Sequence, residues 1–532
     1  MPVITIDPVT RIEGHLHVEV EVEGGRVTNA WTTSTLFRGM ETIVENRPWW
    51  DAQHYTERVC GVCPVPHGHN SAFALEDAAG VDIPPNGRLI RNLLECTQLL
   101  HDHVLWFYIL NGLDYVDIVS ALGAQTQDQS LRRVQARLQA FVDSGQLGFL
   151  DNAYFGHPAY NLPPELNLQL AAHYLEAVTV QAVASEATAI FGGKFPHHMS
   201  TPPGGYSSFP HEEQINSFEF KVRQVKDFID NKMIPDLLAI APYYLEQAQI
   251  GAGHGNYLSW GVLDEDLETG DPYARYFPRG AVFGALEGNL NLEQAESEDV
   301  SVWYTSTWQN PRPGEEFDVE SQGLHPFDAK QIPDFTGPHG ISEVSAVAEE
   351  GGRYAWDRSN LLKDRPVEVG PLAEMLVAYL NGNEDVQRAV DSTLQAVGQA
   401  GNIPVLFSNL GRIAARTLKV QLVADRTLVY VQQLRENMKN GDLEFFTPVP
   451  DRPSGRGFSG WDAPRGSLSH WVELEDGMVK HYSIITPSGW NFSPRSTPDR
   501  VRGPVEEALI GTPVEDPERP LEVLRTLHSF DP

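Results

Sequence analysis

The sequence predicts a mainly α-helical protein with β additions (α+β), in which a large helical-bundle core carries an N-terminal β-hairpin and short peripheral strands. Apolar residues recur at helical spacing over several long segments, whereas alternation of apolar and polar residues is confined to residues 3–33. Glycine- and proline-rich stretches separate these segments. Because no repeat, low-complexity tract or linker divides the chain, we expect residues 1–532 to form a single domain.

The N-terminal region has the pattern of a β-hairpin. Leu16, Val18, Val20 and Val22 alternate with polar residues, and the pair Gly24-Gly25 then interrupts the alternation. Strand-like composition resumes over residues 27–33. A glycine pair between two such runs is typical of a hairpin turn.

Helical patterns dominate the rest of the chain. The longest runs from Asn402 to Asn440, with Gly441 as a stop signal. The other predicted helices are a buried one over 88–110, one from Pro163-Pro164 to Gly192-Gly193, and one over 212–239 with a kink at Pro235. We expect loops and short strands over 255–366, and short strands, turns and one helix near 504–510 in the region 457–532.

Bulk composition excludes several classes of protein. Hydrophobic residues make up 41% and charged residues 21% of the chain, as in soluble globular proteins. The sequence contains no run of about 18 apolar residues, the length that is needed to span a membrane. Residues 1–11 lack a basic segment followed by an apolar one, so no secretory signal is visible and another polypeptide would have to carry any export address.

The formal net charge of −33 argues against a nucleic-acid partner, because phosphate groups attract lysine and arginine. We interpret the charge as a well-solvated acidic surface. Adaptation of the host to high salt is an alternative interpretation.

Cysteine is scarce, with only Cys60, Cys63 and Cys96 in the chain. A disulfide framework is therefore not expected. An iron–sulfur cluster takes about four cysteine thiolates, so this chain cannot hold one on cysteine alone. Cys96 lies on an apolar helical stripe with Leu93 and Leu100, which predicts a small core residue.

Cys60 and Cys63 form a Cys-x-x-Cys turn that can bring two thiolates to one metal ion. Three interpretations compete. The pair could bind structural zinc together with His67 and His69, it could act as a thiol–disulfide motif, or it could belong to a catalytic metal centre that takes further thiolates from distant residues. Spacing alone favours zinc, and the absence of a βαβ pattern disfavours the redox motif.

Several other segments, together with the cysteine pair, resemble the nickel–iron hydrogenase large subunit, and they occur in the family's order across nearly the whole chain. The ending is similar to that of the uptake, membrane-associated branch. The resemblance implies the hydrogenase large-subunit fold. The segments are residues 7–15 (DPVTRIEGH), 37–41 (FRGME), 191–197 (FGGKFPH), 463–466 (APRG), 487–491 (PSGWN) and 527–532 (LHSFDP).

The resemblance implies a nickel–iron centre whose iron carries carbon monoxide and cyanide. Cys60 would be a terminal nickel ligand, and Cys63 would bridge nickel to iron. Soft thiolates suit both metals. Zinc or unligated thiols remain the alternative for this pair.

Roles in proton transfer and charge stabilisation follow from the same resemblance. Glu13 would be the first proton carrier leaving the metals. Arg465 would overhang the open metal position with a charge that does not titrate. Asp102 and Asp531 would pair with this arginine, since a buried charge needs a partner.

The remaining matched residues surround the metals. Pro464 and Ser488 would contact the diatomic ligands of the iron, with Ser488 donating a hydrogen bond. His67 would hydrogen-bond the bridging thiolate. Glu41 matches a carboxylate of a magnesium site. His197 and His198 follow a double glycine and receive no role.

One feature departs from the family pattern. The family continues directly after the residues that match Asp531-Pro532 with a second Cys-x-x-Cys and a histidine, whereas this sequence ends at Pro532. We expect that the sequence stops short of the family's C-terminus. The alternative is a metal-free or zinc-bound, structural or silent homologue on the same scaffold.

The implied reaction is the reversible heterolytic oxidation of dihydrogen to protons and electrons. The implied partner is a hydrogenase small subunit that carries iron–sulfur clusters, since this chain has too few cysteines for an electron relay. Membrane contact would come only through partners. Co-export with the small subunit would place the enzyme at the periplasmic or outer face, and a cytoplasmic location is the alternative. A rival class is a non-enzymatic subunit like the related subunits of respiratory complex I, which lack the cysteines.

Overall fold

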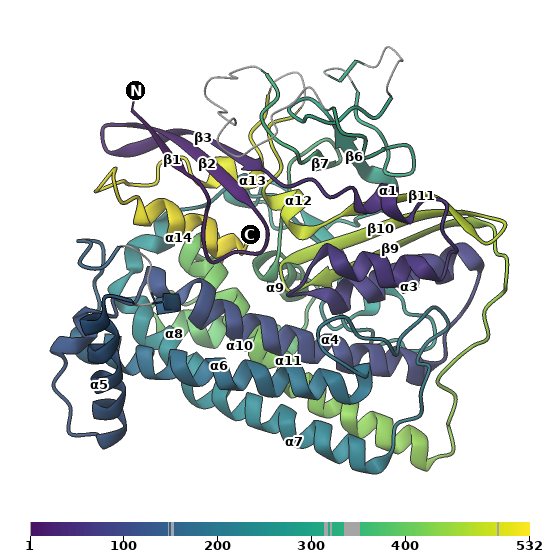
Figure 1. The fold of residues 1–532 in the computed structure, drawn as a ribbon, viewed down its shortest axis with the longest axis horizontal. Coiled ribbons are helices and arrows are strands. Elements are labelled where there is room, and N and C mark those ends of the chain that lie inside the picture. Colours follow the sequence, from purple (N-terminus) through teal and green to yellow (C-terminus); the bar gives the residue numbers. More distant parts are fainter. Residues whose placement is uncertain are drawn as a thin grey trace.

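Four long helices lie side by side and form the lower half of the molecule in Figure 1. This computed structural model describes residues 2–146, 148–150, 154–312, 318–319, 322–334, 352–496 and 500–532. One large apolar core joins the four helices and their neighbours. They are α4 (Pro85–Leu105), α6 (Pro164–Gly192), α7 (Glu212–Phe228) and α11 (Asn409–Lys439).

The predicted helices are confirmed, with changed bounds for two of them. The helix expected over 212–239 is divided, because α7 passes into a π-helical turn, Ile229–Met233, before α8 (Ile234–Ile240) begins. Pro235 follows this π-helical turn directly, and it lacks the N–H that a continuous α-helix would use. Helix α11 begins at Asn409 because the Ser408 side chain caps its first turn by accepting from Gly411 N at 3.1 Å.

The N-terminal hairpin forms as predicted and gains a third strand. Gly24 and Gly25 both have positive φ (59° and 75°), which the turn requires. The C-terminal helices α13 (Pro504–Ala508) and α14 (Leu521–Phe530) pack on this sheet, so that both ends of the chain share one apolar core (Figure 1). The antiparallel strands are β1 (Val3–Ile6), β2 (Leu16–Glu23) and β3 (Arg26–Ser34).

A second antiparallel sheet covers helix α3 (Pro64–Ala79). Its strands are longer than the short ones expected after residue 457. Gly457 allows the close contact, since a Cβ there would lie 2.1 Å from the Ala74 carbonyl oxygen. The strands are β9 (Gly455–Ala463), β10 (Gly466–Glu475) and β11 (Met478–Ile485).

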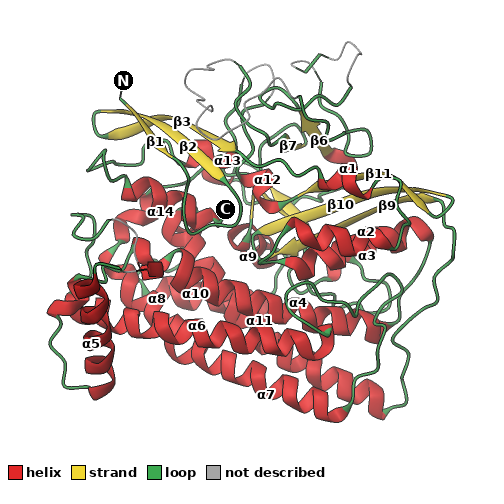
Figure 2. Ribbon diagram, in the orientation of Figure 1, coloured by secondary structure: helices red, strands yellow, loops and turns green. Residues whose placement is uncertain are grey.

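The region expected to hold loops and short strands does so where it is described (Figure 2). Its strands are β4 (Tyr257–Ser259), β5 (Gly280–Val282), β6 (Val300–Trp303) and β7 (Ser359–Leu362), and β8 (Glu368–Val369) follows it. Helices that the sequence pattern did not predict are α1 (Met40–Val44), α2 (Asp51–Thr56), α3, α5 (Gln129–Ser144), α9 (Pro371–Leu380), α10 (Glu384–Ala396), α12 (Pro487–Asn491) and α14. No helix in the described ranges combines the length and apolar character needed to cross a bilayer.

Candidate metal centre

The two cysteines of the Cys-x-x-Cys turn converge at the start of α3. Cys60 is extended after a 3-10 turn, and Cys63 is the N-cap residue of the helix. Their sulfur atoms lie 2.6 Å apart without a disulfide bond, and Cys63 N donates to Cys60 Sγ at 3.0 Å. The partial positive charge at the N-terminal end of the helix acts in favour of a thiolate here, but the hydrogen bond with Cys60 and burial act against it.

The raised pKa of Cys63 fits a position where a bound metal ion displaces the thiol proton. The hydrogen bond with Cys60 raises the pKa of Cys63 well above its ordinary value, and burial adds to the effect. Two thiolates so close together repel each other, and a cation bound between them relieves the repulsion and releases the proton. Soft sulfur donors suit nickel and iron. The residues present therefore fit one half of a thiolate-bound metal centre.

The zinc set of Cys60, Cys63, His67 and His69 does not form. Nδ1 of His69 lies 3.2 Å from Oε2 of Glu95. Within the described ranges, no three side chains of histidine, cysteine, aspartate or glutamate are positioned to hold an ion. His67 lines the same cavity as the cysteines, and burial lowers its pKa to about 3, so its ring is neutral.

Arg465 lies at the tip of the β9–β10 hairpin. Ala463 pairs with Gly466, so Pro464 and Arg465 form a two-residue turn, as the sequence predicts. The turn is buried, with Arg465 only 5% exposed. Without its family match, this motif is more typical of a surface loop.

Two carboxylates lie beside the guanidinium of Arg465. Its Nη2 is 3.1 Å from Oδ1 of Asp531, and its Nη1 is 3.9 Å from Oδ2 of Asp102. Burial opposes the charge of Arg465, but Asp531 and the two nearby cysteines raise its pKa above its ordinary value. The arginine therefore presents a permanent positive charge next to the thiols.

Asp531 reaches this position through a left-handed turn. It ends α14 with a φ of 61°, a conformation that aspartate tolerates better than most residues do. Burial raises the pKa of Asp531, while Arg465 and Arg416 act in the opposite direction. Nη1 of Arg416 lies 3.0 Å from Oδ2 of Asp531 and donates to the Pro464 carbonyl at 2.9 Å.

Sequence reasoning did not identify Arg416. The only signal was a charged residue within the apolar pattern of residues 402–440. Burial lowers the pKa of Arg416 to about 10. Its guanidinium also lies 4.5 Å from the ring centre of Trp106, which helps to hold the group in place.

Asp102 is fixed by its own helix. Gln98, one turn earlier on α4, donates to Oδ1 of Asp102 at 2.7 Å and to the Val62 carbonyl at 2.8 Å. Gln98 therefore links α4 to the loop between the two cysteines. This positioning residue was also missed, because a glutamine on an apolar helix gives no specific signal.

A cavity of about 460 Å³ lies in front of the cysteines and the arginine. Glu13 stands at its wall, where its backbone N donates to the Pro532 carbonyl at 3.2 Å and its Oε1 accepts from Gly61 N at 3.3 Å. The N-terminal loop, the cysteine turn and the C-terminal residue thus meet here. The predicted site residues that line this cavity are Glu13, Cys60, Cys63, His67, Arg465 and Ser488.

Glu41 lies in a neighbouring polar cavity of about 140 Å³. Its Oε1 accepts from Arg358 Nη2 at 2.6 Å and from Ile484 N at 2.8 Å, whereas its Oε2 has no partner in the described part of the chain. Asn360 Oδ1 in the same cavity is likewise unpartnered there. Two such oxygens fit a hard cation, although Arg358 already balances much of the charge.

Asp357 lines both cavities and was not anticipated. Its Oδ1 accepts from Arg358 N at 3.0 Å. Burial raises the pKa of Asp357 to about 6, so the carboxyl exchanges its proton near neutral pH.

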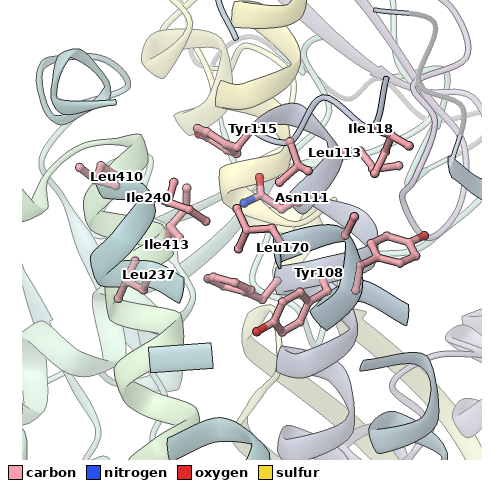
Figure 3. Close-up of a pocket in the computed structure, with 15 residues that line it drawn as sticks. Tyr108, Asn111, Leu113, Tyr115, Ile118, Leu170, Leu237, Ile240, Leu410 and Ile413 are labelled. Carbon is pink, nitrogen blue, oxygen red and sulfur yellow. The ribbon is translucent and has the colours of Figure 1, made fainter. Parts of the chain in front are cut away.

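A separate apolar cavity of about 30 Å³ lies beside the π-helical turn Trp106–Leu110 that follows α4, next to α6, α8 and α11 (Figure 3). Leu170, Leu237 and Ile413 are among its lining residues. The nearby Tyr108 hydroxyl donates to Asp236 at 2.7 Å. This cavity offers no set of acids, bases or ligands comparable to that around the cysteines.

Comparison with known proteins agrees with this geometry. A family model described as nickel-dependent hydrogenase matches residues 38–532, and one described as HoxL-like matches residues 3–32. The uptake hydrogenase large subunit of Rhizobium leguminosarum bv. viciae is 36% identical, covering 99% of this chain and 94% of that protein. The hydrogenase-2 large chain of Escherichia coli K12 is also 36% identical, covering 99% and 95%.

Solved structures of similar fold come from the same kind of enzyme. The Ni-Fe-Se hydrogenase from Desulfovibrio vulgaris Hildenborough in its reduced state aligns with a TM-score of 0.82 and 28% identity, covering 100% of this chain and 98% of that chain. The [NiFeSe]-hydrogenase of Dm. baculatum aligns with a TM-score of 0.80 and 27% identity over the same shares.

Proposed function

Because this chain belongs to the nickel-dependent hydrogenase family, as a large subunit that catalyses hydrogen oxidation, we propose that Cys60 and Cys63 hold one side of its nickel–iron centre. The observation that carries the proposal is the convergence of two thiols, 2.6 Å apart, on a cavity that also receives the buried Arg465. When bound, the metal pair supplies the redox and Lewis-acid chemistry that splits dihydrogen heterolytically. A metal-free or zinc-bound structural role is not favoured.

The C-terminal side of the site completes the ligand set in this proposal. Pro532 lines the cavity that contains Cys60 and Cys63, so a chain that continued past Pro532 would enter the cavity beside them. Two further thiolates from such a continuation would give the four sulfurs that the family uses. Reading the coding sequence beyond Pro532 tests this directly, and a Cys-x-x-Cys-x-x-His in the next few codons is the expected result.

Arg465 would act as a fixed cation beside the metals, because it lines the same cavity as the cysteines. Its charge does not titrate near neutral pH, and Asp531 and Asp102 hold its guanidinium in place. A preorganised charge of this kind stabilises developing negative charge without rearranging during the reaction. Pro464 in the same turn and Ser488 in the cavity wall would contact the carbon monoxide and cyanide ligands of the iron.

Glu13 carries protons away from the thiolates. Its carboxylate accepts from Gly61 N, between the two cysteines, and its side chain is partly exposed. A carboxyl group that touches both the cysteine turn and solvent can take up and release protons. His67 adds a neutral imidazole to the wall of the cavity that the two cysteines line, which suits a hydrogen bond to a bridging thiolate.

A magnesium ion in the smaller cavity is a further part of the proposal. The unpartnered oxygens of Glu41 and Asn360 support it. Replacement of Glu41 by Gln should lower the magnesium content of the purified enzyme while nickel is retained.

The partner that we propose is a small subunit with iron–sulfur clusters. Three cysteines, two of them at the metal centre, leave this chain without an electron relay of its own. Contact with a membrane, at the periplasmic or outer face, would come through that partner. We further propose that residues 1–532 act as one domain, since α11 packs against helices from the middle and from the end of the chain.

Metal analysis of the purified heterodimer tests the central proposal. Nickel together with iron in excess over nickel, since the clusters of the small subunit add iron, infrared bands of carbon monoxide and cyanide, and hydrogen-dependent dye reduction are the expected results. Zinc alone, without hydrogen oxidation, would overturn it.

A further inference from the structure

A line of buried polar side chains leads away from Arg465. It ends on the side of the cysteine turn that lies opposite Glu13. It begins on α4, crosses to α3 and the loop that follows α6, and ends in the 3-10 turn before Cys60. Every member is buried. In order, the side chains are Asp102, Gln98, Glu95, His69, His198 and Glu57.

We propose that this line is a second proton path between the metal centre and solvent, separate from the path through Glu13. The proposal rests on the proposed position of the metal centre beside Arg465. The line shares Asp102 with that site, but its test uses Glu57 and His198, which lie outside the site, so the failure of one proposal can be told from the failure of the other.

The first part of the line follows one face of α4. Residues 95, 98 and 102 are spaced at three and four positions, which aligns their side chains along the helix. Gln98 Nε2 donates to Asp102 Oδ1 at 2.7 Å. The carboxyl groups of Glu95 and Asp102 are close enough for the charge of Asp102 to raise the pKa of Glu95.

The middle of the line crosses between elements. Oε2 of Glu95 lies 3.2 Å from Nδ1 of His69, and the ring centres of His69 and His198 are 5.1 Å apart in an edge-to-face arrangement. Nδ1 of His198 then lies 3.4 Å from Oε1 of Glu57 without forming a hydrogen bond, while its Nε2 bonds to Thr201 Oγ1 at 2.5 Å. Gly68 permits this approach, since a Cβ there would lie 2.6 Å from His198 and 2.7 Å from Glu57.

The outer end reaches solvent at Arg58. Glu57 is buried, but its Oε2 lies 3.0 Å from Nη1 of Arg58, whose side chain is 42% exposed. Gln53 Nε2 donates to Oε1 of Glu57 at 3.0 Å and fixes the carboxyl group. His198, which the sequence placed in a loop without a role, is therefore a buried neighbour of this exit.

Two carboxyl groups of the line, those of Glu57 and Glu95, are held in the protonated form by burial. Burial raises the pKa of Glu57 to about 8, against the nearby charges of Arg58 and Lys194. Burial likewise raises the pKa of Glu95 well above its ordinary value, against Lys419. Each carboxyl group therefore holds a proton that it can pass on.

The histidines of the line accept protons. Burial lowers the pKa of His198 to about 3. Electrostatic interactions with the nearby Arg91, His54, His197 and Arg58 lower it further. Burial also lowers the pKa of His69, with His198 and Arg91 contributing. A neutral imidazole can take a proton on one nitrogen while it releases one from the other.

Several polar atoms beside this line have no protein partner in the described ranges. They include His69 Nε2, Gln98 Oε1 and Gln53 Oε1. Buried polar atoms of this kind are commonly satisfied by ordered water, which can also bridge the longer steps of a proton path. In one passage a proton enters at Asp102 and another leaves from Glu57, so no net charge or electron is gained or lost.

Exchange of deuterium gas with solvent protons tests the proposal on the complete heterodimer. The reaction requires proton movement at the metals but no electron transfer to a dye, and its rate is expressed per bound nickel. The variants are E13Q and E57Q, together with the double variants E13Q/E57Q, E13Q/H198Q and E13Q/E506Q. The matched control is E506Q, because Glu506 is a buried glutamate whose pKa burial raises to about 7 and which lies away from both cavities.

The second path predicts that E13Q keeps residual exchange and that E13Q/E57Q loses a further factor of about 10², the size of a general acid–base contribution. H198Q in the E13Q background should behave like E57Q, and E506Q should not. Equal rates for E13Q and E13Q/E57Q would overturn the second path. A rate for E13Q equal to that of the unmodified enzyme would instead overturn the role of Glu13, and E57Q alone would then decide whether the second path exists.

Discussion

Nη2 of Arg465 lies 3.1 Å from Oδ1 of Asp531 and thereby joins the tip of the β9–β10 hairpin to the last turn of α14. Asp531 in turn lies 3.0 Å from Arg416 on α11. One buried carboxylate therefore connects three elements that are far apart in sequence. Since a buried ion pair loses most of its stabilisation when one partner is removed, the arrangement makes the site sensitive to conservative changes.

Replacement of Arg465 by Lys should lower hydrogen oxidation by about 10²- to 10³-fold while nickel is retained, because lysine keeps the charge but not the planar fork. Turnover per nickel, measured by dye reduction, checks this. R275K is the matched control, since Arg275 is also buried and ion-paired, to Asp264 at 2.9 Å, but does not line the cavity. Equal losses in the two variants would contradict a direct role of Arg465.

Replacement of Cys60 or Cys63 by Ser should abolish nickel binding, because serine oxygen is a poor ligand for soft metals. Cys96 provides the control within the same chain. It is fully buried, and burial raises the pKa of its thiol to about 12, so it is inert. C96A should cost about 1 kcal/mol of stability and leave nickel content unchanged. Nickel analysis distinguishes the outcomes, and a full complement of nickel in C60S would exclude it as a ligand.

Replacement of Glu13 by Gln should lower dye-linked hydrogen oxidation by about 10²-fold, because the amide cannot carry a proton. Nickel content and the apparent Tm should not change, since Glu13 is partly exposed. E23Q, in the exposed turn of the same hairpin, should be fully active. The idea is wrong if E13Q turns over as fast as E23Q.

Glu57 predicts a specific dependence of stability on pH. Burial raises its pKa from 4.5 to about 8, so the folded protein keeps a proton that the unfolded chain releases between these values. Its contribution to stability is complete below pH 4.5 and is lost as the pH rises towards 8. E57Q removes this titration, so the apparent Tm of E57Q relative to the unmodified protein should increase with pH across this window. Scanning calorimetry of both proteins over the window measures it, and a constant difference would show that Glu57 is ionised in the folded state.

Local patterns predicted much of the architecture. The alternation around Gly24-Gly25 predicted the N-terminal hairpin, and the apolar stripes predicted α4, α6 and α11. The lengths of the strands in the β9–β11 sheet were underestimated, because only short strands were expected there. Its strands, such as β10, are buried almost throughout, so their composition lacks the alternation that identifies a half-exposed strand.

The chemistry of the site was predicted unevenly. The Cys-x-x-Cys turn and the Ala-Pro-Arg-Gly turn are local, and both form where their residue types require them. The interpretation of Cys60, Cys63, His67 and His69 as a zinc site was wrong, because the four side chains do not converge. On α3 the side chain of His69 contacts Glu95, and spacing in a motif does not reveal which neighbour a helix faces.

The sequence by itself determined the residue types available for catalysis: a Cys-x-x-Cys pair and an arginine in an Ala-Pro-Arg-Gly turn. Tertiary structure alone decided that Asp531 meets Arg416 and that His198 joins Glu57 to His69. These partners lie on separate elements, and only the burial of shared apolar faces brings such elements together. The pKa values at the site follow from that packing, because desolvation and neighbouring charge are properties of the folded chain.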